Sequence, residues 1–289
     1  MERTEEIKQY LKHKHQGGIS NQKGGLYEDF YAVYQIVSSI AKYKSCFDDV
    51  EFQTQLEDTF VDDMLIANPK QHVYHQLKNT KSLSWGSADR QGDIAFDFAN
   101  QIDDCKERDE DFALKLVYSL KDSKVGMQIP EEIKDYSSVE YFEFQDDLNR
   151  LVMLSTPLKE ALAAIVPDGS SMDELVNVAL VFLGAWKDCD SKNRISLREI
   201  IAKAERIKSV NLNIYPDAAM SIECKEVLDA IEDLKYHIKG RLFYWSIGWM
   251  DGSCPWPEKA ESEILRIRPT DKWELIKLLS YNLLSYEKI

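Results

Sequence analysis

Residues 61–78 have the sequence VDDMLIANPKQHVYHQLK, which predicts a β-hairpin. Residues 61–67 and 73–78 are rich in residues that favour strands, and the segment 68–71 between them is typical of a turn. Two strands joined by so short a turn pair in antiparallel fashion. Side chains two positions apart share a face of a strand, so Gln76 and Lys78 face one way, while His75 and Leu77 face the other. The hairpin could therefore bring Asp63 beside Gln76 and Lys78.

The segments around this hairpin predict an α/β (α+β) core. Apolar residues recur at helical spacing from Leu26 to Ile40, and Glu28 lies near the start of that helix. Residues 50–56 alternate between apolar and polar, as in a strand. A second helix is predicted at residues 94–102 and another strand at residues 112–120. The predicted order is thus helix, three strands, helix, strand.

The character of the sequence changes after Pro130, where helical patterns dominate. We therefore predict a polar leader at residues 1–20, a domain at residues 21–130, and a mostly helical region at residues 131–289 that would bind a partner or form oligomers. Short strands are possible at residues 139–144 and 242–247. The predicted helices of this region cover residues 147–154, 157–166, 172–185, 196–206, 218–234 and 271–285.

The composition constrains function. The chain has 289 residues and a formal net charge of −14. Proteins that bind nucleic acids usually present a basic patch, and an acidic chain forgoes much of the free energy of counterion release. We therefore expect a partner or an oligomeric state to supply the affinity for DNA if the protein is a nuclease. No P-loop motif is present, so the chain itself is not expected to be a P-loop ATPase.

The composition also indicates where in the cell the protein is expected. No run of eighteen apolar residues predicts a membrane span, and the charged N-terminus lacks an apolar signal region. The five cysteines are widely spread and have no zinc-knuckle spacing, which favours reduced thiols. We expect a cytoplasmic protein with no membrane association.

Four residues around the hairpin could form a catalytic set. Asp63 would supply a carboxylate, Gln76 an amide oxygen and Lys78 an ammonium group, and Glu28 could add a second carboxylate. Mg²⁺ (or Mn²⁺) prefers such oxygen ligands and keeps several waters. Phosphodiester hydrolysis needs this chemistry, because a bound metal polarises the phosphate and lowers the pKa of a bound water. Asp62 could replace Asp63 as the ligand.

Each of these residues also has a plain structural interpretation. Asp63 could be an ordinary carboxylate at a strand end. Gln76 and Lys78 could form an exposed polar strand face. Glu28 could simply favour the N-terminus of its helix, where carboxylates suit the helix dipole.

The order of elements, with Asp63 and Gln76-x-Lys78, resembles the PD-(D/E)xK nuclease superfamily and its restriction-endonuclease-like fold. The glutamine form of the second motif resembles Mrr-type restriction nucleases. A wider pattern resembles the double-stranded DNA endonuclease domain of bacterial anti-phage systems, over about residues 20–125. It consists of Gly24-Gly25-Leu26-Tyr27-Glu28, residues 61–66, Tyr74-His75-Gln76-Leu77-Lys78 and Trp85.

The resemblance implies a role for each matching residue. Asp63 would bind the metal, Gln76 would bind it through the side-chain oxygen, Lys78 would be the catalytic lysine, and Glu28 would match the helical acid. Gln76 replaces the commoner Asp or Glu, which removes a negative charge from the metal site and should weaken metal affinity.

The related domain serves as an effector in CBASS systems with SAVED sensors and in Lamassu systems with an SMC-like ATPase. The chain shows no obvious SAVED domain, so it looks more like a Lamassu-type nuclease subunit. The predicted partners are then double-stranded DNA, an SMC-like ATPase with an accessory subunit, and a second copy of the chain.

The loop after the hairpin and a later aromatic cluster each have two interpretations. Lys81, Trp85 and Arg90 could contact DNA, although Trp85 fits slightly better as a cover over the core edge. The aromatic residues of the second region form core or a subunit interface; they are Phe243, Tyr244, Trp245 and Trp249.

The leading hypothesis is a metal-dependent endodeoxyribonuclease that cleaves double-stranded DNA with low sequence specificity. It would be held inactive by its partner and activated by release or oligomerisation. The alternatives are a catalytically inactive adaptor that keeps the nuclease fold and a ribonuclease.

Overall fold

The structure is a computed structural model of the chain. It describes residues 5, 7–10, 22–44, 46–80, 82–121, 123–125, 128–207, 212–215, 218–240, 242–256 and 258–284. The chain divides into two compact units, Met1–Asn211 and Leu212–Ile289. The division falls at residue 211 rather than after Pro130, because the helices within residues 156–206 pack against the helix at residues 22–42 and belong to the first unit.

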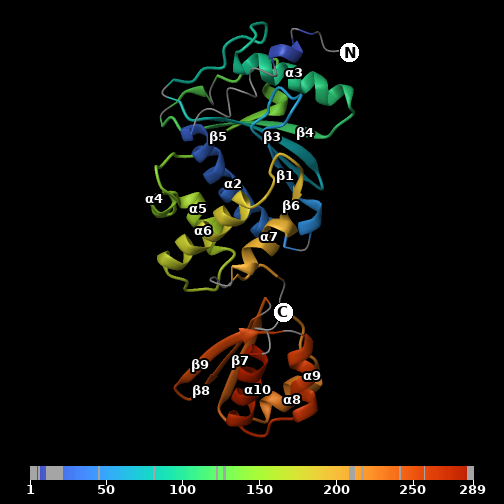
Figure 1. Ribbon diagram of the computed structural model, residues 1–289, viewed down its shortest axis with the longest axis vertical. Coiled ribbons are helices and arrows are strands. Elements are labelled where there is room, and N and C mark those ends of the chain that lie inside the picture. Colours follow the sequence, from blue (N-terminus) through green and yellow to red (C-terminus); the bar gives the residue numbers. More distant parts are fainter. Residues whose placement is uncertain are drawn as a thin grey trace. The chain divides into compact units, whose positions relative to one another are not determined.

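The first unit is built on a mixed six-stranded sheet (Figure 1) with the order β5-β4-β3-β2-β1-β6. The strands are β1 (Glu51–Thr54), β2 (Met64–Asn68), β3 (Gln71–Lys78), β4 (Phe112–Tyr118), β5 (Ser137–Tyr141) and β6 (Ile195–Ser196). Strands β1, β2 and β3 are antiparallel, whereas β3, β4 and β5 run parallel. The expected α/β class is confirmed, and the predicted order is present as helix, three strands, helix and strand.

The hairpin forms with the expected turn. Asn68 pairs with Gln71 across Pro69-Lys70, and Met64 pairs with His75 at the far end. Strand β2 begins at Met64 rather than at Val61. Before β2, the carbonyls of Asp62 and Asp63 accept hydrogen bonds from the N–H groups of Leu56 and Gln55, and Gln101 accepts from the backbone of Phe60 and Val61.

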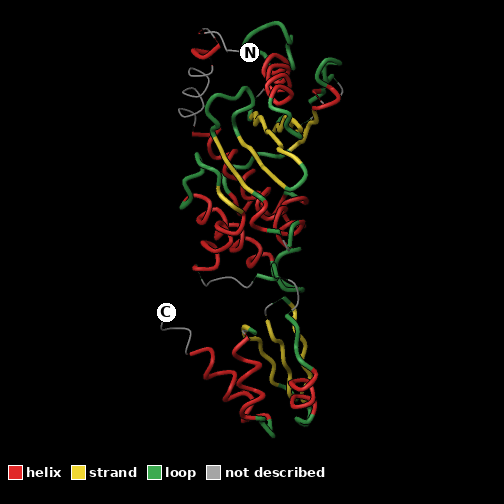
Figure 2. The backbone as a smooth tube through the Cα atoms, turned by 90° about the vertical axis from the view of Figure 1, so that its right-hand side faces the viewer, coloured by secondary structure: helices red, strands yellow, loops and turns green. Residues whose placement is uncertain are grey.

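Helices cover both faces of this sheet. Helix α3 (Ile94–Glu107) packs on one face through an apolar stripe that meets Leu65, Tyr74 and Leu114. Helix α2 (Gln22–Lys42) lies on the other face, where Tyr31 contacts His75. Figure 1 and the rotated view in Figure 2 both show the strands between α3 and the group of helices that contains α2.

The other helices of the first unit extend the layer that contains α2. They are α4 (Leu148–Leu154), α5 (Thr156–Ala163), α6 (Met172–Lys187) and α7 (Leu197–Arg206). Helix α6 packs directly on α2 and begins with a capping box formed by Ser171 and Glu174. Short 3₁₀ turns precede two of the strands, η1 (Phe47–Asp49) before β1 and η3 (Lys134–Tyr136) before β5. Near the N-terminus, Tyr10 packs on Phe96 of α3, while residues 11–20 of the expected leader lie outside the described residues.

The second unit has its own sheet and core. Strands β7 (Leu234–Lys239), β8 (Leu242–Ile247) and β9 (Met250–Pro255) form an antiparallel meander. Helices α8 (Ile222–Asp229), α9 (Glu258–Ile267) and α10 (Lys272–Leu284) pack with them around the buried Phe243. The expectation of a mostly helical region missed β7, β9 and α9. The predicted helix 218–234 is shorter than expected, since α8 spans Ile222–Asp229 and Leu234 already belongs to β7.

The aromatic cluster of the second unit divides in two. Phe243 is fully buried and Trp245 packs partly buried against the same core, as the core interpretation expected. Trp249 is 90% exposed in the turn between β8 and β9, so it is no part of the core.

Because the first unit contains a complete sheet and core, we expect residues 1–211 expressed alone to fold. The fragment should unfold in one cooperative transition, as is usual for a single domain. Thermal unfolding followed by circular dichroism checks this. A fragment without a cooperative transition would show that the first unit depends on residues 212–289.

Across the part of the chain that the structure describes, no helix has both the length and the apolar character needed to cross a bilayer.

Candidate active site

The predicted catalytic residues lie at the end of the hairpin remote from its turn. Asp63 directly precedes β2, and Lys78 is the last residue of β3. Since Met64 pairs with His75, the antiparallel register brings Asp63 level with Gln76. A pairing fixed by a two-residue turn therefore joins side chains thirteen positions apart in the sequence.

Asp63 and Gln76 are in direct contact. Asp63 Oδ2 accepts hydrogen bonds from Gln76 Nε2 and from the backbone N–H of Leu77, the latter at 2.6 Å. Gln76 is only 1% exposed, so the plain interpretation as an exposed strand face is wrong for this residue. Asp62 is also buried, but its backbone carbonyl instead accepts from the N–H of Leu56. The contact with Gln76 thus favours Asp63 as the acid of the site.

Glu28 reaches the same place from α2. Burial, followed by the negative charges of Asp63 and Asp29, raises the pKa of Glu28 to about 8, and the Lys78 ammonium opposes this rise. These electrostatic couplings require that Glu28, Asp63 and Lys78 lie near one another. Helix α2 begins at Gln22 rather than at Leu26, so Glu28 does not lie in the first turn. The plain interpretation of Glu28 as a helix-dipole residue is therefore wrong.

Glu28 and Lys78 are available to bind a ligand. Within the described ranges, no hydrogen bond or ion pair engages either the Glu28 carboxylate or the Lys78 ammonium. Both side chains are half-buried. Ionisable groups whose pKa is shifted by burial and by specific neighbouring charges, as that of Glu28 is, are enriched at functional sites.

The donor atoms of this cluster suit a hard cation. Asp63, Glu28 and the amide of Gln76 offer oxygen, which Mg²⁺ and Mn²⁺ prefer, and Mg²⁺ is commonly held by one or two carboxylates and several waters. No three His, Cys, Asp or Glu side chains converge as a metal-binding group among the described residues. The set therefore fits a metal that keeps most of its water. Gln76 presents its amide nitrogen to Asp63, and a half-turn of the amide would present the oxygen instead.

Two further residues, which the sequence analysis did not predict, help to hold this cluster in place. Gln101 is fully buried in α3, and its Oε1 accepts hydrogen bonds from the N–H groups of Phe60 and Val61, at 2.9 and 3.2 Å. It thereby holds the segment leading to Asp63. The sequence feature that could have indicated this role is a glutamine within the apolar stripe of an amphipathic helix.

The second is Lys187, at the end of α6. Its ammonium pairs at 2.5 Å with Asp29, the neighbour of Glu28. This ion pair ties α2 to α6 next to the cluster. The pairing joins helices far apart in the sequence, and no local pattern indicated it.

The three residues proposed to contact DNA lie in different environments or outside the described residues. Trp85 is 4% exposed, packs edge-on against Phe98 and donates from Nε1 to the carbonyl of Val125, so it belongs to the core and the DNA-contact hypothesis is wrong for it. Arg90 is exposed and pairs with Asp93 at 2.7 Å. Lys81 lies outside the described residues.

We predict that Trp85→Ala lowers the free energy of unfolding by about 3–5 kcal/mol, because it leaves a cavity and an unpaired carbonyl. Arg90→Ala, at an exposed ion pair, should change stability little. Urea unfolding of both variants measures the difference. Equal, small effects would contradict the placement of Trp85 in the core.

His75 faces away from Lys78, as strand parity predicted. The ring packs against Tyr31 at a centroid distance of 5.7 Å. Burial, with a smaller effect from Lys115, lowers the pKa of His75 to about 3. The imidazole is therefore neutral in the folded protein and belongs to the layer between β3 and α2.

Comparison of the chain with models of known protein families, with curated proteins and with solved structures found no match.

Proposed function

We propose that the protein is a metal-dependent endodeoxyribonuclease that cleaves double-stranded DNA with low sequence specificity. One observation carries this proposal: Asp63 and Gln76 are in contact at the end of the hairpin, with Glu28 and Lys78 electrostatically coupled to Asp63 or to each other. These four residues come from α2, from β3 and from the residue that precedes β2, and they are the set that the resemblance to PD-(D/E)xK nucleases implies.

The roles of the residues follow from their chemistry. Asp63 and Gln76 would hold Mg²⁺ or Mn²⁺, and Glu28 would add a ligand or orient a water. When bound, the metal supplies polarisation of the phosphate and a water of lowered pKa. Lys78 would place its ammonium beside the scissile phosphate and stabilise the negative charge that develops there.

The remaining features of the proposal concern regulation. A net charge of −14 disfavours tight binding of DNA by the isolated chain. We therefore propose that a partner holds the nuclease inactive and that release or self-assembly activates it, since a double-strand break needs two cleavages. Membership of an anti-phage complex with an SMC-like ATPase rests on the sequence resemblance.

The direct test is cleavage of labelled duplex DNA, single-stranded DNA and duplex RNA of one sequence by the purified protein. We expect loss of full-length duplex DNA in Mg²⁺ or Mn²⁺, no loss with excess EDTA, and a greater than proportional rise in rate with protein concentration. Cleavage restricted to RNA would favour the ribonuclease alternative.

The hydrogen bond between Gln76 and Asp63 favours a second candidate, a catalytically inactive adaptor. Gln76 directs its amide nitrogen at the acid, as it would if the pair served only to fix the hairpin end. The two candidates differ in metal binding, which an adaptor does not need. Electron paramagnetic resonance of Mn²⁺ titrated with the protein separates them, because the adaptor leaves the spectrum of free Mn²⁺ unchanged.

A further inference from the structure

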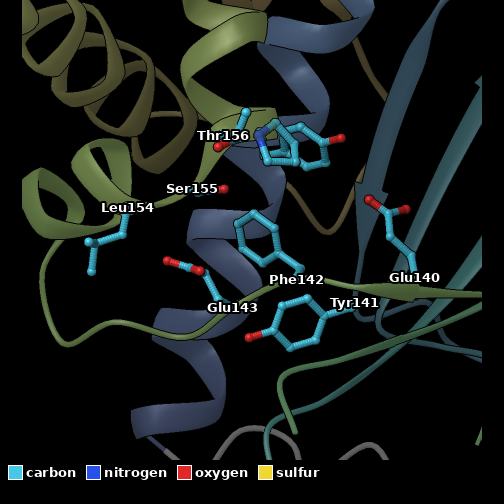
Figure 3. A pocket seen from close by; sticks show the side chains of 9 residues that line it. Glu140, Tyr141, Phe142, Glu143, Leu154, Ser155 and Thr156 are labelled. Atoms are coloured by element: carbon cyan, nitrogen blue, oxygen red, sulfur yellow. The ribbon is translucent and has the colours of Figure 1, made fainter. Parts of the chain in front are cut away.

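A cavity of about 220 Å³ lies beside the end of β5, where the chain passes α2 and the junction of α4 and α5. Its lining includes three aromatic rings, those of Tyr34, Tyr141 and Phe142, and the carboxylates of Glu140 and Glu143 (Figure 3). No lysine, arginine or histidine is among the described residues that line it. The cavity shares no lining residue with the candidate active site.

The two carboxylates are in different states. Figure 3 shows them on either side of the Phe142 ring. Glu140 Oε2 is held by the Lys115 ammonium at 2.8 Å and by the Tyr31 hydroxyl at 3.1 Å, so its charge is balanced. Glu143 Oε1 is buried and has no hydrogen-bond partner in the described part of the chain. Burying an ionised oxygen without a donor is costly, and a donor within the cavity would remove that cost.

The aromatic lining favours a positively charged donor. Tyr34 and Phe142 stack on each other, with centroids 5.4 Å apart and an angle of 17° between their planes, and the exposed Tyr141 adds a ring with open surface. Aromatic faces attract ammonium and guanidinium groups within about 6 Å. The Glu143 oxygen that has no donor and the aromatic rings of the same cavity therefore favour the same kind of ligand.

We propose that this cavity binds a compact organic cation, either an alkylammonium or a guanidinium group. Its volume is below the roughly 300 Å³ at which pockets for drug-sized ligands begin, so the ligand has few heavy atoms or is a single side chain. An anion would be repelled by the carboxylates. A neutral molecule would leave the charge of Glu143 unbalanced.

Isothermal titration calorimetry of the full chain with agmatine tests the proposal, with 1,4-butanediol as the uncharged comparison. We expect saturable binding of agmatine and none of the diol. Glu143→Gln should weaken agmatine binding about tenfold or more, because it removes a charge-assisted hydrogen bond. Glu132→Gln, which removes the same charge at an exposed position outside the lining, should bind agmatine as the wild type does.

A second variant keeps the test decisive if Glu143→Gln does not fold. Leu154 is half-exposed at the cavity, and Leu154→Trp should block it and abolish binding. N-acetyl-arginine methylamide, titrated in parallel, distinguishes a side chain offered by another protein from a free amine: binding of both ligands indicates the former, and binding of agmatine alone the latter. Absence of agmatine binding, or equal binding by the wild type and Leu154→Trp, would overturn the proposal.

Discussion

Lys78→Ala should reduce the rate of DNA cleavage by about a hundredfold or more. Lys78 ends β3 with its ammonium near Glu28, and no ion pair within the described ranges engages it. Removal of one preorganised group that stabilises transition-state charge commonly costs this much. The expected loss is in the turnover rate, because the charge on phosphate develops only in the transition state.

The matched control for this variant is Lys70→Ala. Lys70 is exposed in the turn at the opposite end of the same hairpin, so the substitution removes an equal charge from the same element. We expect the control to cleave DNA at nearly the wild-type rate. Equal losses in the two variants would show that net charge, rather than the position of Lys78, determines the activity.

Asp63→Asn should weaken Mn²⁺ binding by about tenfold or more, since carboxylate charge is a main determinant of affinity for hard cations. The amide oxygen can still accept the hydrogen bond from the Leu77 N–H, which separates loss of charge from loss of structure. Titration calorimetry with Mn²⁺ measures the change.

The neighbouring acid provides the comparison. Asp62→Asn should change Mn²⁺ affinity much less, because it is Asp63 Oδ2 that accepts the hydrogen bond from Gln76 Nε2. The opposite ranking of the two variants would assign the ligand role to Asp62 and would require a different arrangement of the hairpin end.

Local patterns were sufficient to predict the hairpin and much of the cluster. The alternation of residues 73–78 and the turn at Pro69-Lys70 determine which side chains share a face, so the contact between Asp63 and Gln76 follows from the sequence. Helix α2 was also predicted from its apolar repeat, although its start was placed at Leu26 and not at Gln22.

The remaining features depend on packing between distant segments. Gln101 lies forty-one and forty residues beyond the two backbone groups it binds. Trp85 packs against Phe98 and donates to the carbonyl of Val125, forty residues further along the chain. In the second unit, the strand expected at residues 242–247 is present as β8, whereas its partners β7 and β9 were not predicted. The boundary at residue 211 was missed because α5, α6 and α7 complete the first unit through contacts with α2, and α4 packs on α5 and α6, which composition does not reveal.

The most direct test of the central claim is incubation of supercoiled plasmid with rising concentrations of the full chain in Mg²⁺ or Mn²⁺. Circular dichroism of the same samples establishes that the protein is folded. We predict conversion of the plasmid to linear and shorter DNA that requires the metal and is lost in Lys78→Ala. Plasmid that stays supercoiled with folded wild-type protein at every concentration and with both metals, or cleavage that Lys78→Ala leaves unchanged, would contradict the assignment of this cluster as a nuclease active site.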